Sequence, residues 1–297
     1  MAMRSVVYIF LLFFWDISHC TSICNPARGA LKISGGLSLL TNGRESEEGT
    51  SYIECVSWID GIASVKYEYQ PKHGVPNKVK LFPCISTIWN SKNEHANESS
   101  SLQLPFDIWN NRNGHVFSNW KIVHSNESED DNYRVGYRLL LNDRPKTNAN
   151  ESEDMEIMIW LIYQNEYPNE WGTEIKRGIE LCGYCWNLYV SDDHNETKPN
   201  EWTFQSCTNY TRSVNDFDIN VFLQWLYTFT DRSSYISIPR YLIAIQFGQE
   251  IAEGKGMFRI TSFDVVVYTE VSGNTTSLPS STRVTPSAGQ KGQISFS

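Results

Sequence analysis

The stretch MEIMIWLIY, residues 155–163, predicts a β-strand whose two faces differ in character. In an extended strand, successive side chains point to opposite sides of the sheet. The aliphatic residues at 157, 159 and 161 therefore share one face, which we expect to join a hydrophobic core. Glu156, Met158 and Trp160 share the other face, where a carboxylate, a thioether and an indole can meet a ligand.

Runs of similar character recur along the chain between clusters of turn-forming residues. They span residues 52–59, 118–123, 133–141, 185–190, 242–248 and 258–268. Many short strands at this spacing are typical of an antiparallel sandwich or jelly roll. We therefore expect an all-β fold.

One segment departs from the strand pattern. The apolar residues at 217, 222, 225 and 226 fall near helical spacing and follow Asn215 and Asp216, two residue types that cap helices. The sequence thus predicts a single amphipathic helix that follows this cap, ends near Phe229 and packs under the sandwich.

Composition divides the chain into three parts. Residues 1–20 are typical of a secretory signal peptide, because an uncharged apolar run is followed by small residues. Residues 21–271 contain neither a linker nor a repeat, which favours one domain. Residues 272–297 are poor in apolar side chains and rich in Ser and Thr, so we expect a disordered tail.

Charge and sequons indicate where the protein works. The net charge of −9 argues against nucleic-acid binding, which requires clustered Lys and Arg. No segment after the leader reaches the roughly 20 apolar residues of a membrane helix. We expect a secreted, extracellular monomer with no nucleic-acid or membrane partner. Six Asn-x-Ser/Thr glycosylation sequons support export, at Asn97, Asn126, Asn150, Asn195, Asn209 and Asn274.

The cysteines predict a disulfide framework. If the leader is cleaved after Cys20, an even set remains. It comprises Cys24, Cys55, Cys84, Cys182, Cys185 and Cys207. In an oxidising compartment this set indicates three disulfides, and proximity in sequence favours Cys182 or Cys185 as the partner of Cys207. A zinc site formed by these three cysteines and His194 is a weaker alternative, because an exported Cys-x-x-Cys pair tends to oxidise.

A second stretch, QFGQE at residues 246–250, places another carboxylate on a strand. Gln246, Gly248 and Glu250 share a face by the same alternation, and Gly248 leaves room beside the acid. If the strands of Glu156 and Glu250 run antiparallel on one concave sheet, the two carboxylates can meet across a bound sugar.

Two facing carboxyl groups are the requirement of retaining glycoside hydrolysis, which places them about 5–5.5 Å apart. One attacks the anomeric carbon, and the other protonates the departing oxygen. A lone glutamate on a strand is more often a solvated or salt-bridged residue, so alternation by itself does not assign this chemistry.

The two stretches resemble the sequence blocks of glycoside hydrolase family 12, in which a Glu-x-Met-Ile-Trp-Leu strand carries the nucleophile and a Gln-Phe-Gly-x-Glu strand the acid/base. The resemblance assigns Glu156 as nucleophile and Glu250 as acid/base. It implies that Met158, Trp160 and Gln246 contact the substrate.

Extended from Cys24 to Tyr268, the resemblance implies a disulfide between Cys24 and Cys55. It also implies a jelly-roll sandwich of two stacked antiparallel sheets with a concave substrate cleft and one amphipathic helix. The implied activity is a double displacement that cleaves internal β-1,4 bonds of a glucan or xyloglucan polysaccharide. No metal or organic cofactor is implied.

Aromatic residues make up 13% of the chain, which suits a glycan groove because sugar rings stack their C–H faces on flat side chains. Most of these aromatics are expected in the core. We select Trp58 and Trp171 as further sugar contacts.

The chain departs from the family pattern in three places, one of which is residues 25–27, where the family often has a Trp after the first cysteine. Where the family carries an Asn-Asn-Leu-Trp-Gly block with a sugar-stacking Trp, the chain has GGLSL at residues 35–39. Where the family presents an Asp beside the nucleophile, the chain has Arg138. A fixed positive charge there favours ionised carboxylates and weakens Glu250 as a proton donor, and general acid catalysis is typically worth about 10²–10⁴-fold.

Arg138 leaves alternatives open. It can instead bind a sugar hydroxyl or an acidic substituent, and a register shift of one residue would turn it to the other face. The alternative function is therefore a catalytically weak or inactive glycan-binding relative of the same fold.

Overall fold

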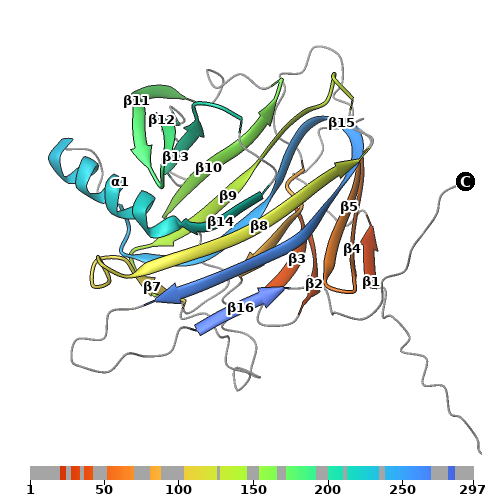
Figure 1. Cartoon of the computed structure of the whole chain (residues 1–297), viewed down its shortest axis with the longest axis horizontal. Helices are drawn as coiled ribbons and strands as arrows, with labels where there is room; N and C mark the ends of the chain where they lie inside the picture. The colour runs from red at the N-terminus through yellow and green to blue at the C-terminus, as the bar shows by residue number, and fades with distance from the viewer. Residues whose placement is uncertain are drawn as a thin grey trace, which may run out of the picture.

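The structure, a computed structural model, is a sandwich of two stacked sheets (Figure 1). It describes residues 21–24, 28–33, 37–42, 52–69, 81–87, 104–125, 128–145, 154–165, 172–191, 200–209, 213–233, 238–268 and 280–284. These residues form sixteen strands and one helix. Their strand pairings are antiparallel, except that β10 and β13 run parallel. The expected all-β jelly roll is confirmed.

Strands from both ends of the chain build each sheet. Sheet A contains β1 (Thr21–Cys24), β4 (Tyr52–Ile59), β5 (Ile62–Tyr69), β8 (His115–Ser125), β14 (Ser213–Asp218) and β16 (Ser280–Val284). Sheet B contains β2 (Arg28–Lys32), β3 (Leu37–Asn42), β6 (Cys84–Thr87), β7 (Phe106–Asp107), β9 (Asn132–Asn142), β10 (Met155–Gln164), β11 (Thr173–Leu181), β12 (Tyr184–Val190) and β13 (Asn200–Ser206).

One long strand, β15 (Tyr241–Tyr268), belongs to both sheets. It pairs with β9 as far as Glu253 and with β5 from Gly254 onward, and Figure 1 shows its blue ribbon turning back along β8. The expectation of two separate strands here is wrong. Gly254 has a φ of 132°, and a Cβ there would lie 2.4 Å from Oδ1 of Asp131, so glycine lets the strand bend without ending.

The space between the sheets is filled by aromatic and aliphatic side chains. Phe247 of β15 is fully buried, with ring centroids of Trp120, Tyr137 and Phe263 within 4.7–5.7 Å. Gln249, two residues on, also points inward and lies 2.7 Å from Nε2 of His124. The alternation expected for QFGQE is therefore confirmed, and its other residues face away from this core.

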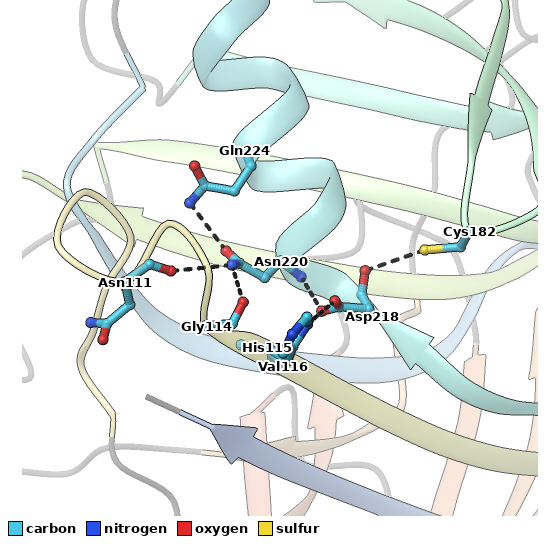
Figure 2. A network of polar contacts seen from close by, with 8 residues as sticks. All are labelled: Asn111, Gly114, His115, Val116, Cys182, Asp218, Asn220 and Gln224. Atoms are coloured by element: carbon cyan, nitrogen blue, oxygen red, sulfur yellow. Dashed lines mark hydrogen bonds and ion pairs between the residues drawn. The ribbon is translucent and has the colours of Figure 1, made fainter. Parts of the chain in front are cut away.

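The helix α1 (Ile219–Ser233) begins four residues later than its expected cap and ends four residues beyond Phe229. Asn215 and Asp216 belong to β14, which pairs with β8, so their assignment as the cap is wrong. Asp218 caps the helix instead. Its Oδ1 accepts the backbone N–H groups of Asn220 and Val116, both at 3.1 Å, and this tertiary contact sets the start of the helix (Figure 2).

Two disulfides are present, Cys24–Cys55 and Cys185–Cys207, as expected. The third expected disulfide is wrong, because Cys84 and Cys182 are free thiols. Five strands of sheet B lie between β6, which carries Cys84, and β11, whose turn carries Cys182. At about 4.8 Å per strand, this span far exceeds the reach of a disulfide. The Cys185–Cys207 bond also rules out the zinc alternative.

Several expectations fall on other parts of the chain. The signal peptide, Trp171 and the sequons at Asn97, Asn126, Asn150, Asn195 and Asn274 lie outside the described residues. Of the sequons, Asn209 is described and is exposed. β16 lies within the segment expected to be a disordered tail, where it extends sheet A by pairing with residues 263–267. The described helix is too short and too polar to cross a membrane.

Candidate active site

Three adjacent strands of sheet B, β10, β9 and β15, bring the two predicted carboxylates onto one face of the sheet. Their inward residues, such as Ile157, Leu139 and Ile245, belong to the hydrophobic core. Glu156 and Glu250 lie on the opposite face. Both β10 and β15 run antiparallel to β9, so they run parallel to each other, and the antiparallel arrangement considered from the sequence is not the one present.

The register places the remaining site residues in cross-strand rows. In one row, Arg138 of β9 lies between Met158 of β10 and Gln246 of β15. Gln246 in turn lies opposite Ser86 of β6. The row continues to Ser38 of β3 and Lys32 of β2. The row therefore includes Ser38, a residue of the GGLSL stretch that stands where the family pattern has its Trp-containing block.

Arg138 holds Glu156 through two contacts. Its Nε donates to Oε2 at 2.9 Å, and its Nη2 donates to Oε1. The side chains are only 17% and 9% exposed, so the pair is largely shielded from water. Arg138 thus lies on the carboxylate face, and the alternative of a shifted register is wrong.

Arg134 forms the second ion pair of this face. Its Nε donates to Oε2 of Glu250, and the two side chains are 3% and 6% exposed. The guanidinium carbon lies 3.5 Å from the ring centroid of Trp160, within cation–π distance. Sequence reasoning missed Arg134. The signal was available, because Arg134 shares a strand face with Arg138, four residues away.

The residues expected to contact sugar differ in their placement. Met158, Trp160 and Gln246 lie on the carboxylate face but are almost fully buried, and Arg134 covers one face of the Trp160 indole. Trp58 lies on β4 of sheet A and packs against the hydrophobic core, so the structure does not bring it to the carboxylates.

Two glycines are paired across β15 and β9, where Gly248 lies directly opposite Gly136. A Cβ on Gly248 would lie 2.2 Å from the carbonyl oxygen of Pro83, and a Cβ on Gly136 would lie 2.1 Å from that of Ile159. The room expected beside Glu250 is therefore taken by the neighbouring backbone. Glycine is required here for close packing.

The neighbouring cysteine does not offer a competing nucleophile. Cys84 lies opposite Gly248 and is fully buried. Burial raises the pKa of its thiol far above the usual range, so the reactive thiolate is scarce. Within the described residues, no group of three or more His, Cys, Asp and Glu side chains is arranged to hold a metal ion.

The sequence matches the family model of Glycosyl hydrolase family 12 over residues 91–268, which is more than half of the chain. The chain belongs to glycosyl hydrolase family 12. A comparison with curated protein sequences gave no match. The family 12 assignment agrees with the carboxylate face, because both sequence blocks that carry Glu156 and Glu250 lie within the matched residues.

Solved family 12 structures share the fold. A family 12 xyloglucanase from Bacillus licheniformis, in complex with ligand, has a TM-score of 0.68 at 20% identity, covering 83% of this chain and 99% of that chain. A metagenome-derived family 12 endoglucanase has a TM-score of 0.64 at 20% identity, covering 85% and 100%. Endoglucanase 3 from Trichoderma harzianum has a TM-score of 0.63 at 18% identity, covering 84% and 98%.

The carboxylate face pairs each of its two glutamates with an arginine. Two guanidinium groups on β9 neutralise the two carboxylates of β10 and β15. An opposite charge at this distance favours the ionised form of a carboxyl group. These four side chains together therefore carry no net charge.

Proposed function

We propose that the protein is a secreted, retaining, endo-acting glycoside hydrolase that cleaves internal β-1,4 bonds of glucan or xyloglucan. The observation that carries this proposal is the placement of Glu156 and Glu250 on one face of three adjacent strands, in a family 12 fold. The substrate class follows from the solved relatives, which include a xyloglucanase and endoglucanases.

In the proposed mechanism, Glu156 attacks the anomeric carbon while Glu250 donates a proton to the departing oxygen. Glu250 then takes a proton from the water that releases the sugar from Glu156. No step needs a metal or an organic cofactor.

The mechanism requires the carboxyl groups of Glu156 and Glu250 to lie close together on sheet B. Glu156 lies opposite Leu140 and Glu250 lies opposite Arg134, so six positions along β9 separate them. At about 3.3 Å per residue, a flat strand would hold them about 20 Å apart. The two carboxylates reach the separation of about 5–5.5 Å of retaining enzymes only if the sheet curls and both side chains reach inward.

Secretion is supported by two disulfides, which persist in oxidising compartments. The exposed sequon at Asn209 and the apolar leader in the sequence agree with this location. We propose that the secreted protein acts as a monomer on extracellular polysaccharide.

The test is hydrolysis of xyloglucan, mixed-linkage glucan and carboxymethylcellulose by the purified chain. Reducing ends should appear, Glu156→Ala should abolish their release, and the first product seen by proton NMR should be the β-anomer. Glu174→Ala, which removes an exposed carboxylate of β11, serves as the matched control. Release that survives Glu156→Ala would refute the nucleophile assignment.

A second candidate function is glycan binding with weak or no catalysis. It is favoured by the two ion pairs, because both carboxylates are already held by arginines. Calorimetric binding of a xyloglucan oligosaccharide that stays intact through prolonged incubation would favour this candidate over the hydrolase.

A further inference from the structure

Arg134 lies between Glu250 and Trp160 on the carboxylate face. Its Nε donates to Oε2 of Glu250, and its guanidinium lies 3.5 Å from the ring centroid of Trp160. Its side chain is 3% exposed. Stacking on the indole and pairing with the carboxylate fix the guanidinium in one position.

An arginine in this position has a definite electrostatic effect. The guanidinium stays protonated at every pH at which proteins fold. A positive charge in contact with a carboxyl group favours the carboxylate, and typical effects are about 1–3 pH units. Because water is largely excluded, solvent screens this interaction less than it screens a surface pair.

Among the described residues, the neighbours of Glu250 on its own and adjacent strands supply no competing charge, and the buried carboxylate of Glu54 interacts with Cys84. On its own strand, the same-face neighbours are Gly248 and Ala252, which carry none. On β10, Tyr163 lies opposite Arg134. On the segment 81–87, Cys84 is the titratable residue, and burial keeps its thiol protonated.

Other charged residues nearby are engaged elsewhere. Arg138 holds Glu156. Glu253 lies at the bend of β15, opposite Asn132. Asp131 accepts the backbone N–H groups of Ser128 and Lys255. Among the described residues, the charge in contact with the Glu250 carboxylate is that of Arg134.

We infer that Arg134 is a positioning residue that holds Glu250 in its ionised form and thereby confines hydrolysis to acidic pH. The inference rests on the proposed function for its catalytic consequence. The positive charge of Arg134 stabilises the carboxylate form, so Glu250 loses its proton at lower pH. The basic limb of the pH–rate profile, which reports this acid, lies correspondingly lower.

The first test compares pH profiles of kcat/KM on xyloglucan for the full chain and its variants. Arg134→Gln should move the basic limb to higher pH by about 1–3 units, whereas Arg134→Lys, which keeps the charge, should restore most of the original profile. Arg177→Gln removes an arginine from the exposed pair with Glu174 and should leave the profile unchanged. A basic limb that stays in place in Arg134→Gln overturns the inference while leaving the hydrolase function intact.

The second test does not depend on turnover. Carboxyl carbon NMR of the full chain, with Glu250 assigned through Glu250→Gln, follows the titration of this group directly. Its midpoint should rise by at least about one unit in Arg134→Gln. A chain that hydrolyses no glucan but shows this rise refutes the proposed function and retains the electrostatic role of Arg134.

Unfolding of a variant does not remove the test. If Arg134→Gln fails to fold, the wild-type titration decides, because a Glu250 midpoint above the ordinary glutamate value of about 4.3 overturns the inference.

Discussion

Arg138 donates two hydrogen bonds to Glu156, from Nε to Oε2 at 2.9 Å and from Nη2 to Oε1. The pair lies on neighbouring strands, β9 and β10, and both side chains are mostly shielded from water. Attack on an anomeric carbon consumes the negative charge of the nucleophile. The ion pair is therefore stronger before attack than during it, and it opposes the proposed reaction.

Replacing Arg138 should speed hydrolysis and weaken the fold. Hydrogen bonds to charged groups contribute about 1.5–3 kcal/mol, so Arg138→Asn should raise kcat on xyloglucan by roughly tenfold or more. It also leaves Glu156 buried without its partner, which typically costs about 3–5 kcal/mol. Steady-state kinetics and urea unfolding measure the two effects. A folded variant with lower kcat would contradict this account.

Substitution of Gly248 by alanine should destabilise the protein. The added Cβ would lie 2.2 Å from the carbonyl oxygen of Pro83 and 2.7 Å from Cβ of Cys84, so the backbone of β6 or β15 has to shift. Overpacking of this kind costs about 1–3 kcal/mol. The free energy of unfolding in urea checks the expectation, which an unchanged midpoint would refute. Glu250 should also lose its alignment, so activity should fall together with stability.

The cap of α1 can be located by paired substitutions. Asp218 Oδ1 accepts from the N–H of Asn220, and its Oδ2 lies 2.7 Å from Nδ1 of His115 (Figure 2). Asp218→Ala should cost about 0.5–2 kcal/mol, the usual range for a lost cap. Asn215→Ala, at an exposed position of β14, should cost less than about 0.5 kcal/mol. Equal effects in thermal unfolding would place the cap elsewhere.

The free thiols should react slowly and at different rates. Burial raises the pKa of Cys182 to about 11, so its thiolate fraction is small at pH 8. As the pH rises from 8 toward the pKa, this fraction grows about tenfold per pH unit. Cys84 is fully buried and should react only in denaturant. Alkylation followed by peptide mass spectrometry should find Cys24 linked to Cys55 and Cys185 linked to Cys207. A peptide that links Cys84 to Cys182 would show that the pairing is different.

Local periodicity in the sequence determined most of the strands and the facing of their side chains. The aliphatic residues of MEIMIWLIY and Phe247 of QFGQE join the core, as alternation requires, because a side chain in a strand has only two sides to choose from. The Cys24–Cys55 disulfide and both carboxylate blocks followed from resemblance to the family, and the structure confirms the disulfide.

Tertiary structure alone decided which groups meet. The register of β9 against β10 and β15 brings Arg138 to Glu156 and Arg134 to Glu250, and no single strand contains that information. The path of β15 through both sheets and the cap at Asp218 likewise depend on contacts between segments far apart in the chain. A sequence pattern fixes the side of a strand on which a residue lies. Its partner is set by the register, which depends on how the whole sandwich packs.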